Sequence, residues 1–181
     1  MKYAKNAMNN IPFFSQWGDT EDEYWKSRTC TLACLASIIS AQHPEQEATL
    51  RPLDVLVAEA LALSARDPNV GWIHERIILL AKNHGVAFAR REYKGEDEAE
   101  NLMRGFTDID TALKNEGLVI LSVKRGWKDD GTPHSVLVVA KEGEEYTIYE
   151  PDATSKEEGG VVRISNATLA QYWRRLAMFA E

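Results

Sequence analysis

The chain has 181 residues, 44% hydrophobic and 27% charged, a composition typical of one globular domain with a substantial core. Its net charge of -7 argues against nucleic acid and anionic membranes as partners, because both select a basic face. The arginine pairs at 90–91 and 174–175 are too short to make such a face, and no apolar run is long enough to span a bilayer. The N-terminal MKYAKNAMNN lacks the apolar region of a signal peptide, so the sequence predicts a cytoplasmic protein, or a secreted one if a leader was removed.

The first half of the chain has mainly helical patterns. Residues 11–14 are apolar and extended, and 30–40 (CTLACLASIIS) are apolar nearly all round, which indicates a buried helix between an N-cap at Thr29 and a stop at Pro44. Further helices are predicted at 52–64, at 72–84 before Gly85, and at 108–115, with a turn at 67–69 and a strand at 87–93.

The second half has mainly strand patterns. Short β-branched runs at 118–123, 135–140, 146–149 and 161–164 are separated by turns, and an amphipathic helix is predicted at 166–178. Helices followed by strands, without regular alternation, indicate an α+β fold. No linker divides the chain, so we expect a single domain over 1–181.

The two cysteines lie four residues apart, on one face of the first predicted helix. Cys30 is in the first turn, where unpaired N–H groups and the helix dipole favour a thiolate. Cys34 is one turn deeper and is expected to be a buried, unreactive thiol. The spacing fits neither a disulfide framework nor a zinc site, so no metal or organic cofactor is expected.

Three other residues have types that could assist a cysteine nucleophile. His134 begins a predicted strand after the loop KRGWKDDGTP, where it should be exposed enough to titrate near neutrality. Glu150 ends the next strand before a proline, and the hairpin around Gly143 should bring it near His134 to orient the imidazole. Gln16 precedes the cysteine and could donate a hydrogen bond to a developing oxyanion, together with the Cys30 N–H. For each residue alone, an ordinary surface or loop side chain is the simpler interpretation.

In this order the residues resemble the papain-like superfamily, and most closely the family-39-like cysteine peptidases, relatives of the bacteriocin-processing double-glycine peptidases. The resemblance covers nearly the whole chain and is carried by IPFFSQW at 11–17, WKSRTCTLACLASII at 25–39, GWIHERIILLAKNHG at 71–85, LVILSV at 118–123, PHSVLVVA at 133–140, IYEPD at 148–152 and ISNATLAQYW at 164–173. It implies a papain-like fold in which an N-terminal helical part packs its central helix on a C-terminal antiparallel sheet.

The resemblance also implies roles for the site residues: Cys30 as nucleophile, His134 as base, Glu150 as the group that orients the base, and Gln16 in the oxyanion hole. Two positions depart from the family pattern. Thr31 follows the nucleophile where the family usually has glycine, and Glu150 precedes the proline where it usually has Asp or Asn. Asp152 is the alternative orienting acid.

The implied function is a thiol hydrolase that cleaves peptide bonds in a peptide or protein partner. Another acyl transfer at the same site, such as deamidation or transpeptidation, would use the same residues. A catalytically impaired, peptide-binding module and a redox role for the two cysteines are the non-hydrolytic alternatives. The substrate is left open, although Trp17, Trp25 and Trp127 are loop aromatics that could line its pocket.

Overall fold

The computed structural model describes residues 11–181, so the prediction about a signal peptide in residues 1–10 lies outside it. Its helices are α2 (Glu23–Lys26), α3 (Cys30–Gln42), α4 (Asp54–Ala62), α5 (His74–Asn83), α6 (Glu98–Lys114) and α7 (Asn166–Tyr172), with shorter helical turns η1 (Pro44–Leu50), η2 (Arg125–Trp127) and η3 (Lys156–Gly160). Its strands are β1 (Arg66–Asp67), β2 (Gly71–Trp72), β3 (Phe88–Glu92), β4 (Val119–Lys124), β5 (Pro133–Glu142), β6 (Glu145–Tyr149), β7 (Val161–Ser165) and β8 (Trp173–Ala180).

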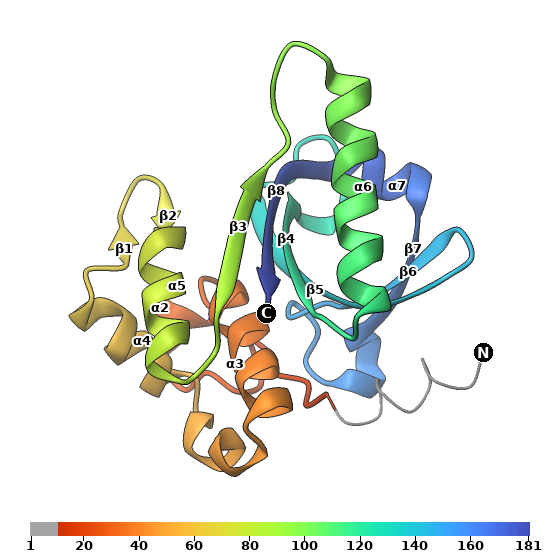
Figure 1. Cartoon of the computed structure of the whole chain (residues 1–181). Helices are drawn as coiled ribbons and strands as arrows, with labels where there is room; N and C mark the ends of the chain where they lie inside the picture. The colour runs from red at the N-terminus through yellow and green to blue at the C-terminus, as the bar shows by residue number, and fades with distance from the viewer. Residues whose placement is uncertain (1–10) are drawn as a thin grey trace.

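An antiparallel sheet forms the centre of the described structure. Its six strands lie in the order β3-β8-β4-β5-β6-β7, and β1 and β2 form a separate small hairpin. Figure 1 shows α2 to α5 gathered on one side of the sheet and α6 and α7 on its other side. The predicted α+β class and the antiparallel sheet built from segments after residue 118 are confirmed, with β3 as an additional edge strand.

The central strand β4 is buried on both faces, which explains the apolar run at 118–121. Along β4, Ile120 packs into the cluster that contains α3, whereas Val119 and Leu121 pack into the cluster that contains residues of α6 and α7. A strand with two buried faces needs apolar residues at successive positions. Full burial of each such side chain stabilises the fold by about 1.5–3 kcal/mol.

Helix α3 is the central helix that the apolar pattern predicts. Its residues from Thr31 to Ser40 are all buried, whereas Cys30, its first residue, is partly exposed. The helix packs against the face of the sheet that carries Leu137 and Val139. The fold therefore holds the first turn of α3 at the start of β5.

The predicted helix at 166–178 is wrong in its second half. Helix α7 ends at Tyr172, and the chain continues as β8, which lies between β3 and β4. Trp173, Ala177 and Phe179 face one core cluster and Met178 the other. Because both faces of this strand are buried, its sequence lacks the apolar–polar alternation that identifies a strand.

The predicted helix at 108–115 is the last part of the longer α6. Asp97 caps the N-terminus of α6 by accepting a hydrogen bond from the Glu100 N–H at 2.8 Å. Gly105 allows α6 to approach β8, because a Cβ at this position would lie 2.3 Å from the ring of Trp173. In the described part of the chain, no helix has the length and apolar character that a membrane span requires.

Candidate active site

The fold places Cys30 at the N-terminus of α3, where the sequence predicts it. Thr29 is the N-cap residue, but its side chain does not cap the helix. Its hydroxyl instead lies 3.1 Å from that of Thr20. The first N–H groups of a helix have no acceptor within the helix, so this end of α3 offers hydrogen-bond donors and a partial positive charge beside the sulfur.

His134 lies at the start of β5, where it pairs with Val123 of β4. The expectation that it is exposed is wrong: only 2% of the residue is accessible, because the β-hairpin and the start of α3 enclose it. Its Nε2 lies 2.5 Å from Oε1 of Glu150. The other ring nitrogen, Nδ1, is buried and makes no hydrogen bond of ordinary geometry within residues 11–181.

Cys30 and His134 alter each other's ionisation. Burial opposes ionisation of the thiol, yet the polar interaction with His134 and its positive charge, a hydrogen bond from the Ser135 backbone N–H and the charge of Arg125 together lower the pKa of Cys30. Burial also opposes protonation of the imidazole, but the polar interaction with Cys30, the hydrogen bond with Glu150 and the negative charges of both groups raise the pKa of His134 to about 10. Between these two pKa values a thiolate and an imidazolium are the favoured pair.

Glu150, rather than Asp152, contacts the imidazole. The Oδ2 atom of Asp152 is 3.9 Å from Nε2 of His134, beyond hydrogen-bond range. Oε1 of Glu150 accepts from the ring and also from the Asp152 backbone N–H at 3.1 Å. This second hydrogen bond fixes the longer Glu side chain in an orientation that reaches the ring.

Asp152 instead joins the loops around the site. Its carboxylate accepts a bidentate pair of hydrogen bonds from Arg125, at 2.6 and 2.8 Å, and one from Trp17 Nε1 at 3.1 Å. It also accepts a hydrogen bond from Nε2 of Gln16, whose backbone N–H donates to the Pro151 carbonyl at 2.9 Å. Gln16 is thus anchored to the segment that carries Glu150, and no hydrogen bond joins it to Cys30 among the described residues.

Thr31, which departs from the family pattern, connects α3 with β5. Its hydroxyl lies 2.8 Å from that of Ser135, and both residues are buried. The two residues directly follow Cys30 and His134 in the sequence. The hydrogen bond therefore fixes the relative position of the two segments that carry the thiol and the imidazole.

Cys34 is buried one helical turn below Cys30, as predicted from its spacing. Burial, together with the negative charges of Cys30 and Glu150, raises the pKa of Cys34 well above its ordinary value. A thiol in this state is a poor nucleophile. Both cysteines are free thiols.

Cys30 and His134 open onto a cleft of about 450 Å³. One wall includes Trp72 and the β1–β2 hairpin, and the other includes Ser122 and Leu176 of the sheet. The expectation that Trp17, Trp25 and Trp127 line the pocket is wrong, because none of them borders this cleft. Trp25 packs against Trp72, with ring centroids 5.8 Å apart, and Trp17 is held by Asp152.

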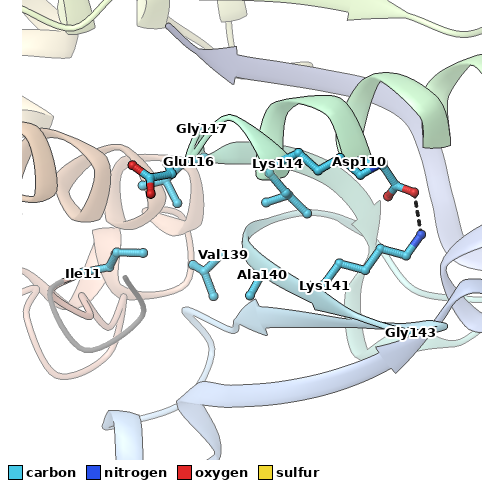
Figure 2. Close-up of a pocket in the computed structure, with 11 residues that line it drawn as sticks. Ile11, Asp110, Lys114, Glu116, Gly117, Val139, Ala140, Lys141 and Gly143 are labelled. Carbon is cyan, nitrogen blue, oxygen red and sulfur yellow. Dashed lines mark hydrogen bonds and ion pairs between the residues drawn. The ribbon is translucent and has the colours of Figure 1, made fainter. Parts of the chain in front are cut away.

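A second hollow of similar volume, about 460 Å³, lies between the end of α6 and the β5–β6 hairpin. Figure 2 shows the ion pair between Asp110 and Lys141 at one side of it, with an N–O distance of 2.7 Å. None of the predicted site residues borders this hollow. The chemistry of the side chains therefore identifies the first cleft as the candidate active site.

His134, Glu150 and Asp152 offer ligand atoms within 4.8 Å of one another, a spacing that a metal ion could use. These atoms already have partners, however. Nε2 of His134 bonds Glu150, and both oxygens of Asp152 accept from the Arg125 guanidinium. A cation here would be repelled by that guanidinium, so the three residues fit a hydrogen-bond network rather than a metal site.

Sequence reasoning missed Arg125 and Ser135 as parts of the site. Arg125 lies in the loop before His134, where the only signal was its position two residues into KRGWKDDGTP. Ser135 acts on Cys30 through its backbone N–H, which no side-chain pattern reveals. Both contributions depend on how the loop and the start of β5 fold around α3.

No protein-family model matches the sequence, and no curated protein matches it. Among solved structures, a Bacillus anthracis protein described as a C39-like peptidase matches with a TM-score of 0.62 and 14% identity, over 96% of each chain. The peptidase domain of Streptococcus ComA, a bi-functional ABC transporter involved in a quorum-sensing pathway, matches with a TM-score of 0.55 and 20% identity, over 89% of this chain and 94% of that domain. At these identities the likeness shows the fold alone: the predicted α+β arrangement with an antiparallel sheet is shared with these two peptidase structures.

Proposed function

We propose that this protein is a cysteine peptidase that hydrolyses peptide bonds with Cys30, His134 and Glu150. One observation carries the proposal: a helix-start thiol with a lowered pKa interacts with a buried imidazole whose pKa is raised to about 10 and whose far nitrogen bonds a carboxylate. These are the nucleophile, the base and the group that orients the base in covalent acyl transfer. The fold that the chain shares with solved peptidases supports the same reaction.

In the proposed reaction, the Cys30 thiolate attacks the carbonyl carbon of the scissile peptide bond. His134 gives its proton to the amine as the carbon–nitrogen bond breaks, which leaves a thioester on Cys30. The neutral imidazole then takes a proton from water as the water attacks the thioester, and the acid product leaves as the thiolate–imidazolium pair reforms. Glu150 keeps the ring oriented and stabilises its protonated form through both catalytic steps.

The negative charge of the tetrahedral intermediate needs hydrogen-bond donors. The backbone N–H of Cys30, at the first position of α3, is one candidate. Gln16 is the other: its terminal amide carries two N–H groups, of which Asp152 accepts one. The Arg125 guanidinium balances the charge of Asp152, so that this carboxylate does not repel the nearby oxyanion.

The test is digestion of a proteome-derived peptide library by the wild-type protein, with new termini identified by mass spectrometry. New termini should appear with the wild type and with Cys34→Ala, which keeps the proposed nucleophile. They should be absent with Cys30→Ala and strongly reduced with His134→Ala. Cleavage by Cys30→Ala at the wild-type rate would disprove the proposal. Deamidated peptides without new termini would instead indicate deamidation, and new N-termini accompanied by peptides joined at the acyl side would indicate transpeptidation.

A further inference from the structure

The cleft beside Cys30 is basic, although the chain as a whole is acidic. Its border includes one carboxylate, that of Glu75, and five cationic side chains: Arg28, Arg66, Arg90, Lys94 and Arg174. The net charge of the chain is -7, so the excess of positive charge at the cleft has the opposite sign to the net charge of the chain. The arginine pairs at 90–91 and 174–175 seemed too short to form a basic face. The fold instead brings one arginine of each pair to this cleft, together with cations from other segments.

Much of this positive charge is not neutralised within the protein. In residues 11–181, Arg28, Arg66 and Arg174 have no carboxylate within 4.0 Å. The contacts of Arg28 are uncharged: its guanidinium donates to the Tyr24 carbonyl at 2.6 Å and lies over the Tyr24 ring. Arg66 donates to the backbone carbonyl of Asp67, and its charge adds a small effect on the Asp67 carboxylate, whose pKa is lowered mainly by backbone hydrogen bonds.

The two remaining cations are partly paired. The guanidinium of Arg90 lies 3.7 Å from the Glu75 carboxylate and also bonds Glu92. Lys94 is 4.0 Å from Glu92, and its side chain is 62% exposed. Even with these acids counted, the cations that border the cleft outnumber the carboxylates at it.

A β-bulge contributes Arg174 to the cleft. In the pairing of β4 with β8, Ser122 is opposite Leu176, but the next residue, Val123, is opposite Trp173. Arg174 and Arg175 are the extra residues, and Arg175 has a φ of 61°. Bulges redirect side chains and are frequent beside active sites. Here the guanidinium of Arg174 donates to the Ser122 hydroxyl at 3.1 Å, on the cleft wall.

We propose that the cleft selects acidic peptides, with Asp or Glu near the bond presented to Cys30. This inference rests on the proposed function for the identity of the reacting bond, and it adds the substrate class. Unpaired cations along a cleft attract an acidic chain during encounter and bind its carboxylates at contact distance. A basic peptide would be repelled by the same side chains.

A peptide fits the cleft better than a nucleic acid, the other common anionic polymer. The cleft leads to a thiol and an imidazole, groups that attack a carbonyl carbon rather than a phosphodiester. Among the residues that border it, Trp72 is the only Trp, Tyr or Phe, and the Arg66 guanidinium lies over its ring, 5.8 Å from the centroid. The interleaved aromatic platforms on which single-stranded bases stack are therefore absent from this border.

Binding tests the inference without requiring cleavage. Fluorescein-labelled octapeptide pools, acetylated and amidated at their ends, would carry Asp/Glu, Asn/Gln or Lys/Arg at two fixed positions in an otherwise randomised sequence. Their affinity for Cys30→Ala would be measured by anisotropy at low and moderate salt. A variant with Arg28→Gln, Arg66→Gln and Arg174→Gln in the same background would test the cleft. Arg76→Gln, an exposed residue of α5 outside the cleft, is the matched control.

Each unpaired arginine should contribute about threefold in affinity, so the acidic pool should bind about thirtyfold more tightly to the parent than to the triple variant. The preference for the acidic pool over the Asn/Gln pool should decrease as the salt concentration rises, and it should be unchanged in the Arg76→Gln variant. Equal binding of the acidic and Asn/Gln pools, or tighter binding of a single-stranded oligonucleotide of equal charge, would overturn the inference. If acidic peptides bind but the wild type cleaves nothing, the proposed function fails while the inference stands.

Discussion

Replacement of Glu150 by Gln removes the charge beside His134 while keeping the size of the side chain and an acceptor oxygen. The present hydrogen bond is 2.5 Å long, and only 14% of the Glu150 side chain is exposed, so solvent screens it weakly. A hydrogen bond to a charged group contributes about 1.5–3 kcal/mol. At about 1.36 kcal/mol for each pH unit, the pKa of His134 should fall by about 1–2 units. The direction is downward, because the lost carboxylate stabilises the imidazolium.

Glu150→Asp should have a similar effect for a geometric reason. Removal of one methylene withdraws the carboxylate by about 1.5 Å. The distance from the carboxylate oxygen to Nε2 of His134 would then increase from 2.5 Å to about 4 Å, beyond hydrogen-bond range. The activity of either variant should fall about 10- to 100-fold, because displacing a catalytic group by about 1 Å can lower the rate by about 100-fold.

The assay is a pH titration of the His134 ring nitrogens by ¹⁵N NMR, which needs no substrate. The wild type should titrate near the value of about 10, and both Glu150 variants should titrate lower. Glu157→Gln, at an exposed position with no ion pair in the described structure, is the matched control. An unchanged midpoint in Glu150→Gln, or a larger fall in Asp152→Asn, would refute the assignment of Glu150 as the orienting acid.

Three further substitutions test the surrounding contacts. Cys34→Ala should leave the alkylation rate of Cys30 unchanged and should lower the free energy of unfolding in urea by about 1–2 kcal/mol, because Cys34 is only a small buried group. Alkylation of Cys34 in the wild-type protein would contradict this. Thr31→Val should lower the free energy of unfolding by about 1–2 kcal/mol because it leaves the Ser135 hydroxyl unpaired, and a double-mutant cycle with Ser135→Ala should show coupling between the two positions. Additive effects of the two substitutions would argue against the hydrogen bond. Asp152→Asn should lower peptidase activity about tenfold because it weakens the hydrogen bond that positions Gln16, and it should leave the rate of Cys30 alkylation unchanged. An equal decrease in activity and in alkylation rate would show that Asp152 helps to activate the thiol instead.

The parts of the structure that depend on local sequence could be predicted from it. The all-round apolar segment after Thr29 indicated a buried helix, and Cys30 therefore had to lie at the start of that helix. The proline after Glu150 fixed the end of β6, and the hairpin then brought Glu150 toward His134. In each case neighbouring residues determine the backbone, and the short hairpin connection leaves little freedom for the pairing.

The parts that depend on distant contacts could not be predicted in this way. Strand β8 resembled a helix because its position between two strands buries both of its faces. The exposure of His134 was overestimated because α3, which covers it, is far away in the sequence. The basic cleft was missed for the same reason, since Arg28, Arg66 and Arg174 come together only through the tertiary fold.

The central claim is that His134 holds Cys30 as a thiolate, and the pH dependence of Cys30 alkylation by iodoacetamide tests it most directly. In the wild type the rate should be nearly independent of pH through neutrality, up to the His134 pKa of about 10, because the thiolate is already formed. In His134→Ala the rate near neutral pH should be lower and should rise about tenfold per pH unit, as for a thiol of ordinary or raised pKa. Superimposable profiles of the two proteins would contradict the claim.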